Sequence, residues 1–162
     1  MDSTARGRPS RGAPRGFTVI EVLITMVVLG VLMAVAFPSF QSSIRKSRRS
    51  EAITALTNIQ QAQERHRSTN ASFIANITAA PPTGLGQPAT RTSSGYYDLS
   101  VSGNTATAYV ATATAVAGTS QANDGNCAVL AVQMSGGNVK YGAGASIDWS
   151  AANTDPNRCW AR

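Results

Sequence analysis

Three features of this 162-residue chain have residue types that could do chemistry. Cys127 and Cys159 are the only cysteines, and they could form a disulfide, stay buried as free thiols or act as a redox pair. His66 is the only histidine, so a zinc site has too few nitrogen and sulfur ligands. The run Asn123-Asp124-Gly125-Asn126 offers oxygen ligands, but no glutamate follows at the EF-hand spacing. We therefore expect a turn there and not a calcium site.

The remaining residues do not form a recognisable catalytic set. The sequence has no Gly-x-Ser-x-Gly motif, no phosphate-binding loop and no paired acidic site. His66 falls on an apolar helical stripe, which is typical of a half-buried structural histidine. We predict that the chain is not an enzyme and requires no cofactor or metal.

Glu21 has the most unusual setting in the sequence. It is the only charged residue among the 21 residues from Phe17 to Phe37. As a helix this run is about 31 Å long, close to the thickness of a bilayer's hydrocarbon core. An ionised carboxylate there costs a few kcal/mol, so Glu21 is expected to stay hydrated near the headgroups or to pair with a nearby cation.

The formal charge of +6 is unevenly distributed along the chain. Such a charge would suit nucleic acid or anionic lipid, but four arginines lie within residues 1–16. A second basic cluster lies just beyond the apolar run, and we expect it to be a solvated helix face near lipid headgroups. It consists of Arg45, Lys46, Arg48 and Arg49.

The elements that must position these residues follow an α+β pattern. Pro38 predicts a kink rather than a stop, because no further proline or glycine occurs from Ser39 to Thr69. Apolar residues spaced by three and four predict an amphipathic helix with one face packed against a head. These residues are Ala52, Leu56, Ile59 and Ala62, followed by His66.

The remainder of the chain predicts an antiparallel sheet. Residues 70–94 are rich in proline and glycine, so we expect an irregular connection. Alternating apolar residues and glycine turns predict two hairpins, which would bury one sheet face on the amphipathic helix. The expected strands cover residues 97–102, 105–117, 130–134 and 139–141.

The N-terminal residues resemble those of type IV pilins. The match comprises Gly16-Phe17-Thr18-Val19-Ile20-Glu21, the apolar stretch and Pro38 at the twenty-second position counted from Phe17. In that family a prepilin peptidase cuts after the glycine, the new N-terminus is methylated, and the glutamate pairs with a neighbour's amine. The resemblance implies cleavage between Gly16 and Phe17, N-methylation of Phe17, and assembly roles for Glu21 and Pro38.

The resemblance also implies a domain organisation. Residues 1–16 would be a cleaved leader, 17–37 a transmembrane and assembly helix, 38–69 an amphipathic continuation, and 70–162 a globular β head. An even number of cysteines in an exported chain favours a Cys127–Cys159 disulfide, which would close a C-terminal loop like that of pilins. Short motifs around residues 47–52, 63–65 and 159–162 resemble minor pilins of the PilE type.

By this resemblance the chain would be a minor pilin stored in the bacterial inner membrane with a periplasmic head. It would assemble with other pilin subunits into a surface fibre for adhesion, twitching motility or DNA uptake. Its other partners would be the prepilin peptidase and methyltransferase, the inner-membrane assembly machinery and membrane lipid. The alternatives are a pseudopilin of a type II secretion system and a DNA-binding minor pilin. Candidate DNA contacts, which are few and scattered, are Arg91, Lys140, Arg158 and Arg162.

Overall fold

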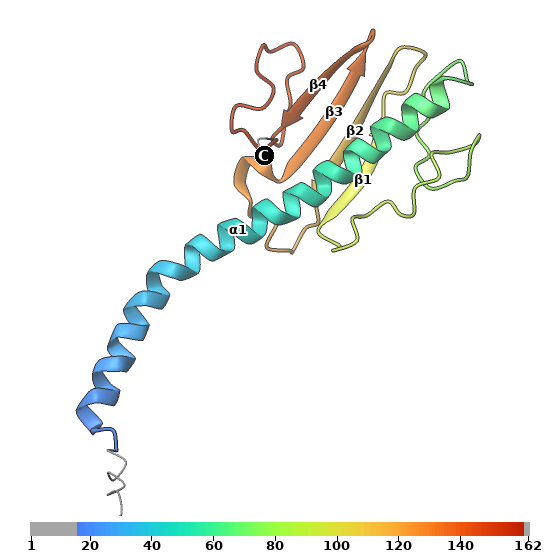
Figure 1. Ribbon diagram of the computed structural model, residues 1–162. Helices are drawn as coiled ribbons and strands as arrows, with labels where there is room; N and C mark the ends of the chain where they lie inside the picture. Colours follow the sequence, from blue (N-terminus) through green and yellow to red (C-terminus); the bar gives the residue numbers. More distant parts are fainter. Residues whose placement is uncertain (1–15, 161–162) are drawn as a thin grey trace, which may run out of the picture. The chain divides into compact units, whose positions relative to one another are not determined.

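The computed structural model describes residues 16–160 of the chain. A single long helix, α1, runs from Val19 to Arg67, so the helix does not stop at Pro38, as predicted (Figure 1). Its first turn is capped by Thr18, whose Oγ1 accepts a hydrogen bond from the backbone N–H of Glu21 at 3.3 Å. The chain divides into two compact units, the first ending at Phe40 and the second beginning at Gln41.

The first unit consists of apolar helix with its side chains exposed. All the described large apolar residues from Phe17 to Phe40 are exposed, including 82% of Phe17 and 74% of Val35. By length and composition α1 is able to cross a membrane. Apart from Glu21, its charged residues lie beyond Phe40. Burying the apolar side chains requires lipid or other apolar helices, because the described chain leaves them uncovered.

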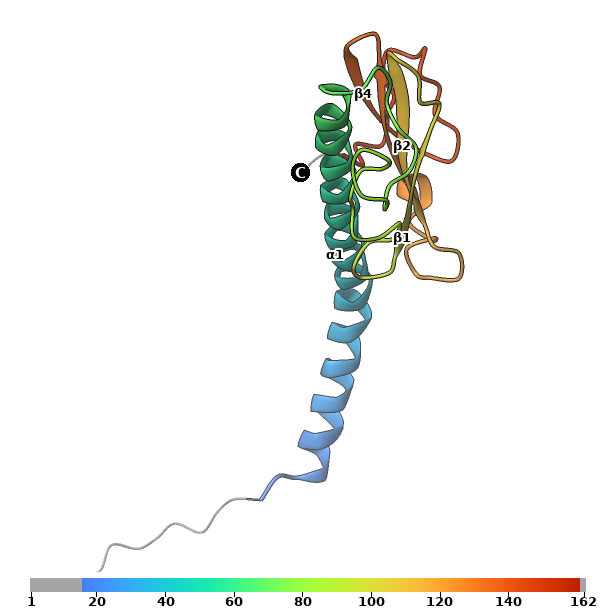
Figure 2. The ribbon, with the colours of Figure 1, turned by 90° about the vertical axis from the view of Figure 1, so that its right-hand side faces the viewer.

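The second unit is an α+β head in which the last turns of α1 lie across one face of a four-stranded antiparallel sheet (Figure 2). The strand order is β1-β2-β3-β4, and each strand pairs with the next along the chain. A short 3-10 helix at Gly125–Cys127 precedes β3. The strands are β1 Tyr97–Ser102, β2 Ala108–Ala115, β3 Val129–Ser135 and β4 Asn138–Ala143.

Strand β2 is shorter than the predicted segment 105–117. Its N-terminal end is displaced because Thr105 Oγ1 accepts hydrogen bonds from the backbone of Thr107 and Ala108, which forms a turn. At the other end the N–H of Val116 bonds to the carbonyl of Tyr96, outside the β2–β3 ladder. Local side-chain acceptors therefore compete with strand pairing at the start of this segment.

The core lies between α1 and the sheet. The predicted apolar stripe of α1 is confirmed, since Ala52, Leu56, Ile59 and Ala62 are all buried. Two large aromatic residues of the sheet, Tyr97 and Tyr109, are fully buried against it, together with aliphatic and small residues of the central strands. The small strand residues leave space for the aromatic rings and the helix.

Gln63 is a polar member of this core that the sequence pattern did not reveal. Its side chain is fully buried on α1. The amide Nε2 donates to the carbonyl of Ile74 at 2.6 Å, and Oε1 accepts from the N–H of Ile74 at 3.1 Å. One side chain thus satisfies both backbone groups of a residue in the irregular 70–96 connection and attaches that connection to the helix.

Candidate functional site

The N-terminal segment that the sequence predicts to act in assembly is exposed over residues 16–37. Gly16 and Phe17 lie immediately before α1, and Glu21 occupies its first turn. A carboxylate in the first turn of a helix interacts favourably with the positive end of the helix dipole. The backbone of Pro38 lies within the same helix. All four predicted residues are therefore on one continuous segment, and Glu21 is available to a cation from outside the described chain.

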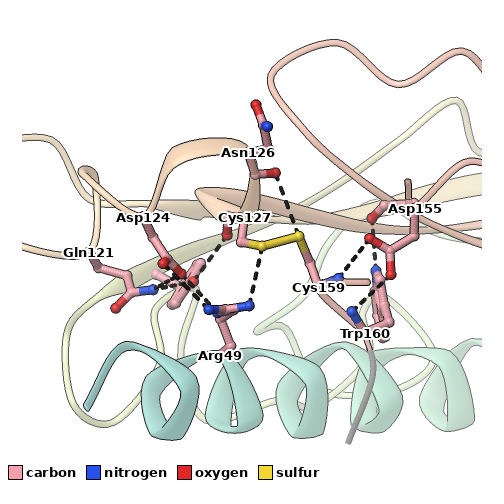
Figure 3. The surroundings of a disulfide bond; sticks show 10 residues. Arg49, Gln121, Asp124, Asn126, Cys127, Asp155, Cys159 and Trp160 are labelled. Atoms are coloured by element: carbon pink, nitrogen blue, oxygen red, sulfur yellow. Dashed lines mark hydrogen bonds and ion pairs between the residues drawn. A yellow bond between two sulfur atoms is a disulfide. The ribbon is translucent and has the colours of Figure 1, made fainter. Parts of the chain in front are cut away.

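The predicted disulfide is present in the head. Cys127 and Cys159 are bonded, with 5.5 Å between their Cα atoms, and both are buried. The bridge connects the 3-10 helix before β3 to the C-terminal segment (Figure 3). Asp155 orders that segment, because its carboxylate accepts hydrogen bonds from the N–H groups of Cys159 and Trp160 at 2.8 and 2.9 Å. The disulfide loop is consequently held at both ends.

The C-terminal loop also covers the edge strand β4. Trp160 donates its indole N–H to the carbonyl of Gly142 at 2.8 Å, and its ring packs on Tyr141 with centroids 4.9 Å apart. An added Cβ at Gly142 would lie 3.1 Å from the Trp149 ring, so that tryptophan packs against the β4 backbone. Both tryptophans anchor the loop, and they protect a strand edge that could otherwise pair with another chain.

Arg49 connects α1 to the disulfide. Its Nη1 donates to Cys127 Sγ at 3.2 Å, and its Nε lies 2.8 Å from Asp124 Oδ2 (Figure 3). The Nε–H is not aligned with that oxygen, but Nη2 donates a long hydrogen bond to the other carboxylate oxygen, Asp124 Oδ1, at 3.5 Å. Gln121 donates to Oδ2 of the same carboxylate at 2.8 Å. Asp124 is therefore engaged within the head, in the turn that the sequence predicted.

The interpretation of the basic cluster as a solvated face is wrong for Arg48 and Arg49, and Arg45 is half-buried as well. The guanidinium of Arg48 stacks over the Tyr96 ring at 3.5 Å and donates to the Tyr96 hydroxyl at 2.8 Å. It also donates to Ser120 at 2.6 Å. Arg48 and Arg49 are half-buried because they are on the side of α1 that faces the head. Lys46 is exposed, as expected.

The fold does not gather the candidate DNA contacts on one surface. Arg91 lies beside β1 and pairs with Asp98 at 2.6 Å, whereas Lys140 lies on β4 at the opposite edge of the sheet. Lys140 donates to the carbonyl of Trp149 at 2.7 Å. Arg158 is exposed beside the disulfide, and Arg162 lies outside the described residues. Hydrogen bonding to Asp98 raises the pKa of Arg91, so this cation stays charged.

Ionisable groups inside the head are held by local contacts. Partial burial alone would raise the pKa of Glu51, but hydrogen bonds from Ser93 and Ser94 outweigh that effect and lower it. Burial raises the pKa of Tyr97 to about 12, although its hydroxyl accepts a hydrogen bond from Gln121. His66 is half-buried near Asn70, as expected of a structural histidine. These groups stabilise the head, and none is arranged as a nucleophile with a base.

Two family models match the chain. The model described as "Type IV minor pilin ComP, DNA uptake sequence receptor" matches residues 38–131. The model described as "Prokaryotic N-terminal methylation motif" matches residues 11–37. The two matches adjoin at Phe37 and Pro38 and include Gly16, Phe17 and Glu21 in the methylation motif.

Curated proteins match shorter stretches. The "Type IV major pilin protein PilA" of Myxococcus xanthus (strain DK1622) is 38% identical over 82 residues, which cover 48% of this chain and 37% of that protein. The "Fimbrial protein" of Moraxella nonliquefaciens is 43% identical over 42 residues, covering 26% and 27%. The "Fimbrial protein EcpC" of Eikenella corrodens is 42% identical over 38 residues, covering 24% and 25%. The chain thus spans well under half the length of each relative.

Proposed function

The chain belongs to the type IV minor pilins of the ComP family, and from this membership we propose that it is a structural subunit of a type IV pilus. The observation that carries the proposal is the adjacency of two features on one helix. An exposed apolar segment with a methylation motif leads directly into a head matched by the minor pilin model. Before assembly the subunit is anchored in the bacterial inner membrane, and it then assembles with other pilins. A pseudopilin of a type II secretion system is less well supported, because the matched model is that of a pilus subunit.

Processing comes first in this proposal. A prepilin peptidase cuts between Gly16 and Phe17, and the new amine of Phe17 is methylated. These residues lie just before α1, where the backbone has no helical hydrogen bonds and is open to an enzyme. Cleavage leaves Thr18 in place as the cap of the helix.

Assembly then transfers α1 from lipid into a bundle of apolar helices. The exposed side chains from Phe17 to Phe40 keep an apolar environment throughout, so the transfer exposes little apolar surface to water. Glu21 pairs with the Phe17 amine of a neighbouring subunit. An unpaired charge is expensive in such a medium, and this pair therefore fixes the axial register of the subunits.

The test is incorporation of Glu21 variants into pili. We expect Glu21→Val and Glu21→Gln to reach the membrane at wild-type levels with the disulfide formed, but to be strongly depleted in sheared fibres. Thr25→Val is a matched control, since it also removes a polar group from the same helix, where the Thr25 hydroxyl donates to the carbonyl of Val22. Normal incorporation of both Glu21 variants would contradict the assembly role.

A second function, DNA binding, is favoured by the description of the matched model as a DNA uptake sequence receptor. The matched stretch contains Arg91 but ends before Lys140 and Arg158. Because Asp98 neutralises Arg91, the candidate contacts that remain among the described residues are Lys140 and Arg158, which are both exposed.

A mobility-shift titration of the full chain in neutral detergent tests DNA binding. We expect duplex binding that weakens steeply as salt rises, because phosphate contacts release counterions. The variants Lys140→Gln and Arg158→Gln should weaken binding and reduce the salt dependence, while Arg91→Gln should change little. A chain that does not bind duplex at low salt would remove this second function.

A further inference from the structure

A cationic cavity lies beside the disulfide, within the second unit. Its volume is about 550 Å³. One wall is a single face of α1, where Lys46, Arg49 and Ser50 follow at helical spacing. The other wall is Arg158 with its neighbour Asn157. Three cations and two hydrogen-bond donors therefore line one space, together with Ile53 and the disulfide cysteines Cys127 and Cys159.

The positive charge of this cavity is not cancelled internally. Among the described residues, no aspartate or glutamate lines it. Asp124 pairs with Arg49 but does not itself line the cavity. Asp155 lies nearby in the sequence, and both oxygens of its carboxylate already accept backbone hydrogen bonds. The side chains of Lys46 and Arg158 are exposed and form no hydrogen bond or ion pair with any other residue that the structure describes. Two unpaired cations thus face a common space.

The backbone places Arg158 there at a cost. Its φ of 52° lies in the left-handed region, which residues other than glycine rarely adopt. A turn closed by its N–H to the carbonyl of Asp155 and the adjoining disulfide hold it in that conformation. The ammonium of Lys46 and the planar guanidinium of Arg158 together match an anion with several acceptor oxygens.

We propose that this cavity binds a phosphate group, carried by a phospholipid headgroup or by free phosphate. The inference goes beyond pilus assembly and duplex binding, since it requires neither a second subunit nor nucleic acid. Lys46 follows Phe40, the last described exposed apolar residue of α1, by fewer than two helical turns. Cations so close to an apolar span commonly meet anionic headgroups, which favours the lipid source.

Equilibrium dialysis of radiolabelled inorganic phosphate against the full chain in neutral detergent tests the site. We expect saturable binding that Lys46→Gln and Arg158→Gln each weaken about five- to tenfold, as loss of one partly solvated ionic contact predicts. Arg65→Gln is the matched control, because it removes an exposed cation of α1 outside the cavity. Arg158→Gly should also weaken binding without destabilising the head, since glycine adopts a positive φ freely.

Competition then separates the sources. Phosphatidylglycerol and a galactosyl diacylglycerol with the same acyl chains differ in the phosphate of the headgroup. If only phosphatidylglycerol displaces the labelled phosphate, the site binds a phospholipid headgroup. Phosphate binding without displacement by either lipid assigns it to free phosphate. The inference is overturned if phosphate does not bind, or if the Lys46→Gln, Arg158→Gln double variant binds it as the wild type does. It is also overturned if only duplex DNA uses these two residues.

Discussion

Arg49 Nη1 lies 3.2 Å from Cys127 Sγ, and through this contact the long helix holds the disulfide of the head. The two residues are 78 positions apart in the sequence. The same guanidinium attracts Asp124, with side chains only 17% and 8% exposed. The helix, the turn before β3 and the C-terminal loop therefore share one charged junction. Mutations there should affect all three elements together.

Arg49→Met is expected to destabilise the head by about 3 kcal/mol, because it leaves the largely buried Asp124 without its counter-ion. Denaturant unfolding of the full chain in neutral detergent measures the loss. The Arg49→Met, Asp124→Asn double variant should recover part of it. Strictly additive effects of the two substitutions would show that the pair is not coupled.

Gly142→Ala is expected to displace the C-terminal loop. The new Cβ would lie 2.7 Å from Ile147 and 3.1 Å from Trp149, closer than packed carbon atoms allow. We expect a cost of about 1–3 kcal/mol, typical of an overfilled site, and a change in tryptophan fluorescence. Combining Gly142→Ala with Ile147→Ala, which removes the closest overlapping atom, should recover part of the stability. If Gly142→Ala alone leaves both signals unchanged, the loop does not pack on β4 as described.

Gln63→Ala is expected to loosen the 70–96 connection, because both backbone groups of Ile74 lose their partner. Leaving a buried donor and acceptor unsatisfied costs about 2–4 kcal/mol. Hydrogen exchange should show faster exchange of the Ile74 amide than in the wild type. Gln60→Ala is the control, since this glutamine is only partly buried on the same helix. Equal exchange rates in the two variants would argue against the bidentate contact.

Glu51 attaches the loop around Ser93 and Ser94 to α1 by accepting hydrogen bonds from both serines, and protonation of Glu51 in acid should weaken this attachment. The pKa of Glu51 is lowered in the folded chain, so this group stabilises the head at pH values above its ordinary value of 4.5. That contribution is lost as the pH falls through the lower, folded-state value. Glu51→Gln should be less stable than the wild type at neutral pH, and the difference should shrink in acid. Thermal unfolding between pH 7 and roughly pH 3 measures the difference. A constant difference would refute the linkage.

The sequence predicted the elements of the fold well because their signals are local. Helix α1, its apolar stripe and the two hairpins follow from residue spacing and turn residues within single segments. The start of strand β2 was predicted three residues too early, because Thr105 Oγ1 competes for the backbone hydrogen bonds there. Arg48 and Arg49 were misplaced because their charge suggested solvent, whereas Tyr96 and Asp124 supply partners from distant segments.

By itself the sequence predicted an N-terminal site, from Gly16 through Glu21, because the motif is contiguous and is recognised from the order of its residues. It also favoured the Cys127–Cys159 bridge, because only two cysteines were present. Only the tertiary structure decided which charges act together. Antiparallel pairing and the disulfide bring Arg158 to the face of α1 that carries Lys46, while they separate Arg91 from Lys140. Electrostatic interactions depend on the distance between charges in space, and the order of residues along the chain does not give that distance.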